Sequence, residues 1–126
     1  MKRWIVAVVF VGLLLASGLG IAHEGESHGE EQGLHSVTGE VVDLACYLGH
    51  GEMGPAHRDC AQKCIASGLP VGIKSGDEIF IAITSEHGTA NATLASLAAK
   101  QVTAEGVVTE RNGVHLIAIK KVTLKE

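Results

Sequence analysis

The three cysteines of this 126-residue chain lie within nineteen residues of one another, and that spacing limits the fold more than any other feature of the sequence. A helix is expected over 55–67, because a Gly-Pro pair stands at its start and a glycine stands just after its end. On such a helix His57, Cys60 and Cys64 fall at i, i+3 and i+7, so they share one face. Cys46 ends the apolar run that precedes the helix. We therefore expect three sulfurs and one imidazole to converge where a strand meets a helix.

The odd number of cysteines bears on their chemistry, because a framework made only of disulfides would leave one thiol over. A bridge between Cys60 and Cys64 does not suit a regular helix. Cβ atoms four residues apart on a helix are about 5–6 Å from each other, whereas a disulfide needs roughly 3.5–4.5 Å. A bridge from Cys46 to either helix cysteine is geometrically possible and would fasten the strand to the helix. A metal site is the favoured interpretation, since His57 lies on the same face one turn before the two helix cysteines.

A set of three cysteines and one histidine suits tetrahedral zinc, and thiolates also select Cu(I). The sequence therefore predicts that the chain holds one soft metal ion, copper or zinc. The predicted ligands are Cys46, His57, Cys60 and Cys64. His50 and Met53 lie in a glycine-rich loop between strand and helix, so either can add a further ligand.

The first 35 residues are expected to lie outside the folded domain. Residues 1–22 have the order of a secretory signal peptide: two basic residues, an apolar run, and small residues up to Ala22. The apolar run is short for a membrane span, so no stable span is expected after cleavage. Residues 23–35 contain three histidines, four glutamates and almost nothing apolar, which predicts a flexible arm that collects metal weakly or is a plain linker. We expect an exported protein, periplasmic or extracellular, with one folded domain over 36–126.

The charge and composition exclude several function classes. After removal of residues 1–22, eight basic and fourteen acidic residues remain, a formal charge of −6, and two aromatic residues are left. Such a chain lacks the positive charge and the stacking side chains that nucleic-acid binding uses, and it has no basic face for an anionic membrane. The sequence contains no Ser/His/Asp set, phosphate loop or pair of catalytic carboxylates, so we do not expect an enzyme.

Alternating apolar and β-branched residues predict five short strands. The strands are expected over 37–46, 69–73, 78–83, 101–110 and 114–124, and a second short helix, capped by Asn91 or Thr93, is expected before the fourth strand and reaches Lys100. Asn112-Gly113 is a strong hairpin signal between the last two strands. This order predicts a mainly β fold with two short helices: a small, partly open, five-stranded OB-like barrel. A small sandwich is the alternative. Gly39 and Gly106 fall where barrel strands bend sharply.

Motifs on both sides of the cysteines add to this picture. Thr38-Gly39-Glu40-Val41-Val42-Asp43 is followed by Cys46-Tyr47, Gly54, His57, Cys60-Ala61 and Cys64, and then by Gly68-Leu69-Pro70-Val71-Gly72. In this order the motifs resemble a family of small exported bacterial domains of OB-like fold, over roughly residues 36–124. The resemblance implies the barrel fold and the cysteine site, and it implies no particular function. The Cys-x-x-x-Cys pair also resembles copper sites of the assembly factors and electron-transfer domains of respiratory oxidases, but those have other folds, so that likeness concerns the ligands alone.

Other polar residues have simpler interpretations. His87 and His115 are expected at the surface or in hydrogen bonds rather than as ligands. Asp43 is expected to be a solvated strand carboxylate, with the orientation of His57 or of a helix end as the alternative.

Taken together, the residues predict an exported, non-catalytic metal-binding protein for metal handling or delivery, with another envelope protein as the recipient. Two alternatives stay open from the sequence. One is a disulfide-stapled OB-fold interaction domain. The other is a thiol/disulfide redox protein of the cell envelope, in which Cys60 and Cys64 exchange with Cys46 and Lys63 lowers a thiol pKa.

Overall fold

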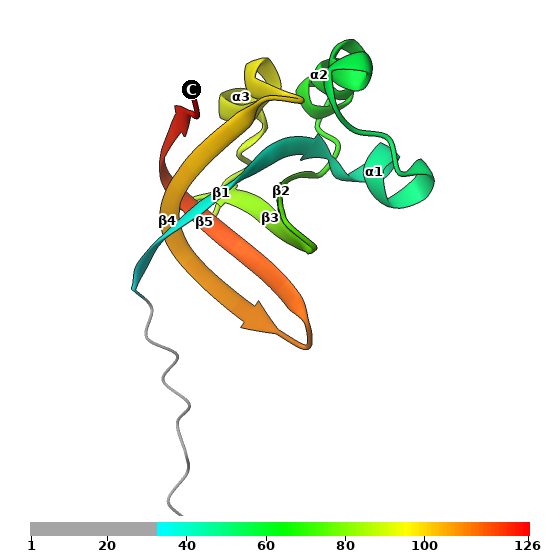
Figure 1. Cartoon of the computed structure of the whole chain (residues 1–126). Coiled ribbons are helices and arrows are strands. Elements are labelled where there is room, and N and C mark those ends of the chain that lie inside the picture. Colours follow the sequence, from blue (N-terminus) through cyan, green and yellow to red (C-terminus); the bar gives the residue numbers. More distant parts are fainter. Residues whose placement is uncertain (1–32) are drawn as a thin grey trace, which may run out of the picture.

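Five strands close into a barrel in the order β1-β2-β3-β5-β4 (Figure 1). The structure is a computed structural model, and it describes residues 33–126. The strands are β1 (Leu34–Asp43), β2 (Val71–Ser75), β3 (Glu78–Thr84), β4 (Gln101–Arg111) and β5 (Val114–Leu124). Neighbouring strands are antiparallel except for β3 and β5, which are parallel. The mainly β, OB-like barrel expected from the sequence is confirmed, and it is closed rather than partly open.

Short helices occupy two of the connections between strands. Between β1 and β2 lie α1 (Leu44–His50), the 3₁₀ turn η1 (Pro55–His57) and α2 (Arg58–Ala66). Between β3 and β4 lie α3 (Asn91–Leu94) and the 3₁₀ turn η2 (Ala95–Leu97). Figure 1 shows α1, α2 and α3 gathered over one end of the barrel. Within residues 33–126, none of the helices has the length and apolar character that crossing a membrane requires.

The first strand ends earlier than predicted, and this is the main correction to the expected elements. The alternation over 37–46 predicted a strand reaching Cys46, but the strand stops at Asp43 and a helix begins at Leu44. The side chain of Asp43 causes the change, because its Oδ1 accepts a hydrogen bond from the Ala45 N–H at 3.0 Å and caps the new helix. Cys46 therefore lies on α1 and not on a strand.

The start of β1 also differs from the expected boundary of the folded part. Leu34 pairs with Val107 and His35 with Gly106 of β4, so both residues belong to the barrel rather than to the arm predicted over 23–35. Residues 23–32 of that arm and the predicted signal peptide over 1–22 lie outside the described residues.

The later elements follow the sequence closely. β3, β4 and β5 end within one residue of the predicted bounds, and Asn112 and Gly113 have φ angles of 54° and 79°, as a two-residue hairpin turn requires. The second strand covers 71–75 instead of 69–73. The expected cap by Asn91 or Thr93 is wrong, because Ala90 holds the cap position of α3. Asn91 instead donates from Nδ2 to the carbonyl oxygens at the end of α2 and in the following turn, Ile65 and Leu69, at 2.7 Å each.

The core fills the barrel and continues under the helices. Fully buried side chains from the strands meet Ile65 of α2 and Leu94 of α3, both 0% exposed. Two glycines let the strands approach: a Cβ on Gly39 would overlap the carbonyl of Lys74, and one on Gly106 would overlap that of Ala118. The register of β4 against β5 shifts between Glu105 and Gly106, which fits the sharp bend predicted at Gly106.

Candidate metal centre

The backbone at the end of β1 places Cys46. Asp43 is the last residue of the strand and the N-cap of α1, so Cys46 is the third residue of the helix. The helix is seven residues long and ends at Gly51, whose φ of 74° is the left-handed conformation that glycine adopts without strain. Its short length keeps Cys46 close to the end of the barrel.

A second anchor on β1 places His57 and the start of α2. Glu40 is 7% exposed, and its Oε1 accepts a hydrogen bond from the Gly54 N–H at 2.6 Å. Pro55 then opens the 3₁₀ turn, and the N–H of His57 donates to the carbonyl of Gly54 at 3.0 Å. These contacts hold the loop after α1 against the strand, so His57 lies beside the helix that carries Cys46.

The helix α2 presents the other two cysteines. Ala61 and Ile65 are buried against the core, at 3% and 0% exposure, and they fix which face of α2 points inward. Cys60 is exposed and Cys64 is half-buried. The helix predicted over 55–67 is shorter, because residues 55–57 form the 3₁₀ turn η1 and α2 ends at Ala66; Gly68 has the left-handed φ of 100° expected just after the helix.

The sulfur of Cys46 is the shared member of two groups of possible ligand atoms. In the first group it lies within 4.8 Å of a ring nitrogen of His57 and of the sulfur of Cys60. In the second it lies within 4.8 Å of the sulfur of Cys64 and of a carboxylate oxygen of Asp43. The three cysteines and His57 are therefore found in two overlapping groups that share Cys46, whereas the sequence predicted one group of four. All three cysteines are free thiols, so the alternative of a bridge from Cys46 to α2 is not found in the described structure.

Asp43 corrects the expectation of a solvated carboxylate. The residue is 1% exposed, and its two oxygens have different surroundings. Oδ1 caps α1, while Oδ2 is buried and has no N–H or O–H partner; the thiols of Cys46 and Cys64, which are weak donors, lie near the carboxylate. A sequence signal for this residue exists: Asp before a Leu-Ala-Cys run of helix-compatible residues is a typical N-cap.

The imidazole of His57 has a similar unsatisfied atom. Its Nε2 is buried without a hydrogen-bond partner, and its Nδ1 lies 3.8 Å from Oε2 of Glu52. The space bordered by Asp43, Met53 and His57 has no room for a water molecule. Among the described residues, Asp43 Oδ2 and His57 Nε2 are the buried side-chain atoms left unpaired, and both belong to the cysteine groups. Each such atom ordinarily costs about 1–3 kcal/mol, which a bound cation at the site would offset.

The carboxylate of Asp43 also sets the state of the thiols. Hydrogen bonding to Asp43, followed by desolvation and by the charge of the same carboxylate, raises the pKa of Cys46 to about 12. Desolvation and then the charge of Asp43 raise the pKa of Cys64. The lowered thiol pKa expected from Lys63 is therefore wrong for these two cysteines. At neutral pH the metal-free thiol of Cys46 is protonated, so an ion that binds there must displace its proton.

The geometry suits a small, soft cation. Two sulfurs on a tetrahedral zinc ion at 2.3 Å would be about 3.8 Å apart, so atoms within 4.8 Å of one another need to close by about 1 Å at most. The further ligands considered from the loop differ in position. His50 is exposed and belongs to neither group, whereas Met53 is 38% exposed and borders the same small space as His57.

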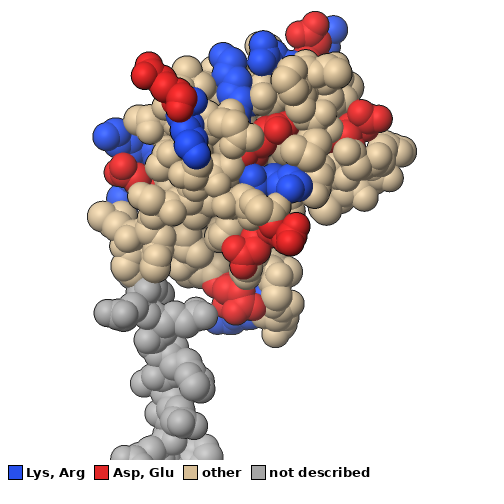
Figure 2. Space-filling view, in the orientation of Figure 1, with Lys and Arg blue, Asp and Glu red and all other residues tan. Residues whose placement is uncertain are grey.

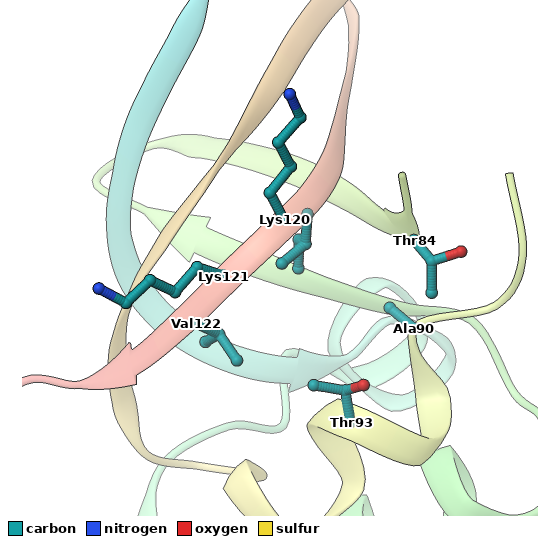
Figure 3. A pocket seen from close by; sticks show the side chains of 7 residues that line it. Thr84, Ala90, Thr93, Lys120, Lys121 and Val122 are labelled. Carbon is teal, nitrogen blue, oxygen red and sulfur yellow. The ribbon is translucent and has the colours of Figure 1, made fainter. Parts of the chain in front are cut away.

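The remaining polar residues and pockets lie apart from this cluster. His87 is exposed, and His115 packs against Phe80 with ring centroids 5.2 Å apart, as expected for histidines that are not ligands. A pocket lined in part by Thr84, Thr93 and β5 contains none of the cluster residues, and two lysines of β5, Lys120 and Lys121, extend from it in different directions (Figure 3). On the face in Figure 2, basic and acidic side chains are interspersed rather than gathered by sign.

Comparison of the chain with protein-family models, with curated proteins and with solved structures found no match. The function of the cluster therefore has to be inferred from its own geometry.

Proposed function

We propose that this chain is an exported metal-binding protein that holds a soft metal ion for handling or delivery. The ligands are Cys46, His57, Cys60 and Cys64; copper is the favoured ion and zinc the alternative. The observation that carries the proposal is the position of the Cys46 sulfur, which is within 4.8 Å of donors from both η1 and α2. The buried, unpaired Nε2 of His57 supports it, because an imidazole nitrogen without a hydrogen bond is free to bind a cation.

Exposure along the cluster supports a role in transfer rather than permanent storage. Cys60 is exposed while Cys46 and Cys64 are half-buried, so an ion can be captured first by Cys60 and then by the inner sulfurs. Handover runs in reverse, as a ligand of the recipient replaces His57 or the nearby Met53. Export rests on the signal-peptide pattern of residues 1–22, and the recipient is a second envelope protein.

The thiol/disulfide alternative has weaker support. Redox-active cysteines depend on the thiolate as nucleophile, and their pKa is typically lowered. The pKa values of Cys46 and Cys64 are raised, which disfavours the reactive thiolate. We propose no catalytic role for the cluster.

Metal content tests the proposal. The exported chain, purified anaerobically without chelator, is expected to contain about one equivalent of copper or zinc and no disulfide. Cys46→Ser should remove the bound metal, because it deletes the sulfur common to both groups, and His57→Ala should weaken copper binding at least tenfold. His50→Ala is the matched control, since His50 is an exposed histidine outside both groups, and it should bind metal normally. Three free thiols with no copper or zinc above the level of Cys46→Ser would overturn the proposal.

A further inference from the structure

The two groups around Cys46 differ in the hardness of their ligands. The outer trio consists of Cys46, His57 and Cys60, two sulfurs and one imidazole nitrogen. The inner trio consists of Asp43, Cys46 and Cys64, in which a carboxylate oxygen replaces the nitrogen. Thiolate and imidazole ligands suit Cu(I), whereas a carboxylate suits harder, divalent ions and is an accepted zinc ligand.

Asp43 is built to present this oxygen. One carboxylate oxygen is fixed by its hydrogen bond to the Ala45 N–H, so the other has a defined direction. That second oxygen, Oδ2, is buried and unpaired on a residue that is 1% exposed. A carboxylate so oriented and so short of partners is held ready for a cation rather than for solvent.

The charge of the bound state favours a divalent ion beside Asp43. With metal bound, the inner trio carries three negative charges, from the thiolates of Cys46 and Cys64 and the carboxylate of Asp43. One Cu(I) leaves a net charge of −2 in a partly buried site, and one Zn(II) leaves −1. The closer the ion lies to the buried carboxylate, the more this difference matters, because partly buried charges are poorly screened.

From these observations we infer that Asp43 determines metal specificity and that Asp43, Cys46 and Cys64 form a position for a divalent ion such as Zn(II). Copper(I) occupies the outer trio, and the two positions share the sulfur of Cys46. This inference rests on the proposed function, and it adds to that function a second ligand set and a residue that separates the two metals.

Asp43→Asn and His57→Ala test the inference in opposite directions. Asparagine keeps the helix cap, because it caps as well as aspartate, and it removes the anionic ligand. The full chain is titrated anaerobically with Co(II), a substitute for Zn(II) whose thiolate charge-transfer bands report only cobalt bound to sulfur. The same proteins are titrated with Cu(I) in competition with a chromophoric Cu(I) chelator. Asp59→Asn, which removes an exposed carboxylate of α2, is the matched control, and circular dichroism checks the fold.

We expect Asp43→Asn to weaken Co(II) binding at least tenfold and to change Cu(I) binding less than threefold. His57→Ala should do the reverse, Cys46→Ser should lose both ions, and Asp59→Asn should match the parent chain. Equal effects of Asp43→Asn on both ions, or no effect on Co(II), would overturn the inference while leaving metal binding intact. Cu(I) binding without any thiolate-bound Co(II) would overturn it as well. Loss of both ions from the parent chain would instead overturn the proposed function.

Discussion

The barrel and the segment between β1 and β2 differ in their buried polar atoms. The barrel interior is apolar, and its central side chains, such as Ile73, Val102 and Ile117, are 0% exposed. The β1–β2 segment (44–70), together with the end of β1 on which it sits, contains both of the buried side-chain atoms that lack partners among the described residues. Unpaired buried atoms destabilise a protein, so they are expected where a ligand binds and not where the chain is merely packed. The barrel therefore stabilises the fold, and the β1–β2 segment with the end of β1 carries the candidate ligand atoms.

The two buried acidic residues of β1 show this contrast within one strand. Glu40 uses Oε1 to hold the Gly54 N–H at 2.6 Å, and its role is to fasten the segment to the barrel. Asp43 uses one oxygen to cap α1 and leaves the other unpaired, and a carboxylate oxygen of this residue lies within 4.8 Å of the sulfurs of Cys46 and Cys64. Three substitutions can separate the structural roles from the chemical one.

The largest effect is expected from Gly106→Ala. A Cβ at this position would overlap the carbonyl of Ala118 on the neighbouring strand, and backbone atoms cannot move aside cheaply. We expect a loss of about 3 kcal/mol or more in the free energy of unfolding, measured by urea denaturation. Gly51→Ala is the matched change in the β1–β2 segment. It meets no atom within 4 Å, so it should cost only the left-handed strain of alanine, about 1–2 kcal/mol. If the Gly106→Ala protein were as stable as the Gly51→Ala protein, the barrel strands would tolerate an added Cβ as well as the β1–β2 segment does, which would contradict this prediction.

Glu40→Gln is expected to have a smaller effect. Glutamine keeps an acceptor for the Gly54 N–H but loses the charge that strengthens the bond, so stability should fall by about 1 kcal/mol. The β1–β2 segment should then be more exposed in hydrogen exchange than the barrel strands. Glu105→Gln, at an exposed position of β4, provides the control and should stay within about 0.5 kcal/mol of the parent. Protection lost evenly over barrel and segment would contradict the anchoring role.

The smallest effect on stability, and the most specific one, is expected from Asp43→Asn in metal-free protein. Because Asp43 raises the pKa of Cys46 to about 12, its neutral replacement should lower that pKa and increase the thiolate fraction at pH 8. Alkylation of Cys46 by iodoacetamide, followed by peptide mass spectrometry, should become several-fold faster, while Asp59→Asn should leave the rate unchanged. An unchanged rate in Asp43→Asn would show that the carboxylate does not control the thiol.

The same pKa shift has a consequence for stability. The folded state holds the Cys46 proton more tightly than the unfolded state, whose thiol has a pKa near 9.0. The contribution of this proton is therefore complete below about pH 9 and is lost as the pH rises towards 12. Metal-free protein should lose stability over that range, and Asp43→Asn should lose less.

Local sequence patterns predicted those strands whose limits are set by residues next to them in the chain. The hairpin of β4 and β5 followed from Asn112-Gly113 between two alternating runs, since only a few residue pairs adopt that turn. The end of β1 did not follow, because the alternation of Val42, Leu44 and Cys46 continues past the point where Asp43 caps a helix. Whether a residue caps a helix depends on the direction that the backbone takes after it, and the alternation of apolar residues does not indicate that direction.

The candidate site shows the same division. The spacing of His57 and Cys60 predicted that they lie together, and they do, although His57 is on η1 and Cys64 belongs to the other group. Asp43 was missed, because its burial comes from the packing of the β1–β2 segment against the end of the barrel. Sequence alone treats an Asp on a strand as solvated, which is the usual state of a carboxylate.

By itself, then, the sequence determined the run of strands, the β4–β5 hairpin, and the presence of His57, Cys60 and Cys64 within one short segment, all of which are local features of the chain. Only the tertiary structure decided where Cys46 points, which oxygen of Asp43 is left unpaired, and that one sulfur belongs to two groups of donors. These features arise when a capped strand end, an anchored loop and a packed helix meet. Each of those contacts joins residues that are distant in the chain or depends on how the segment folds back, so no local pattern encodes them.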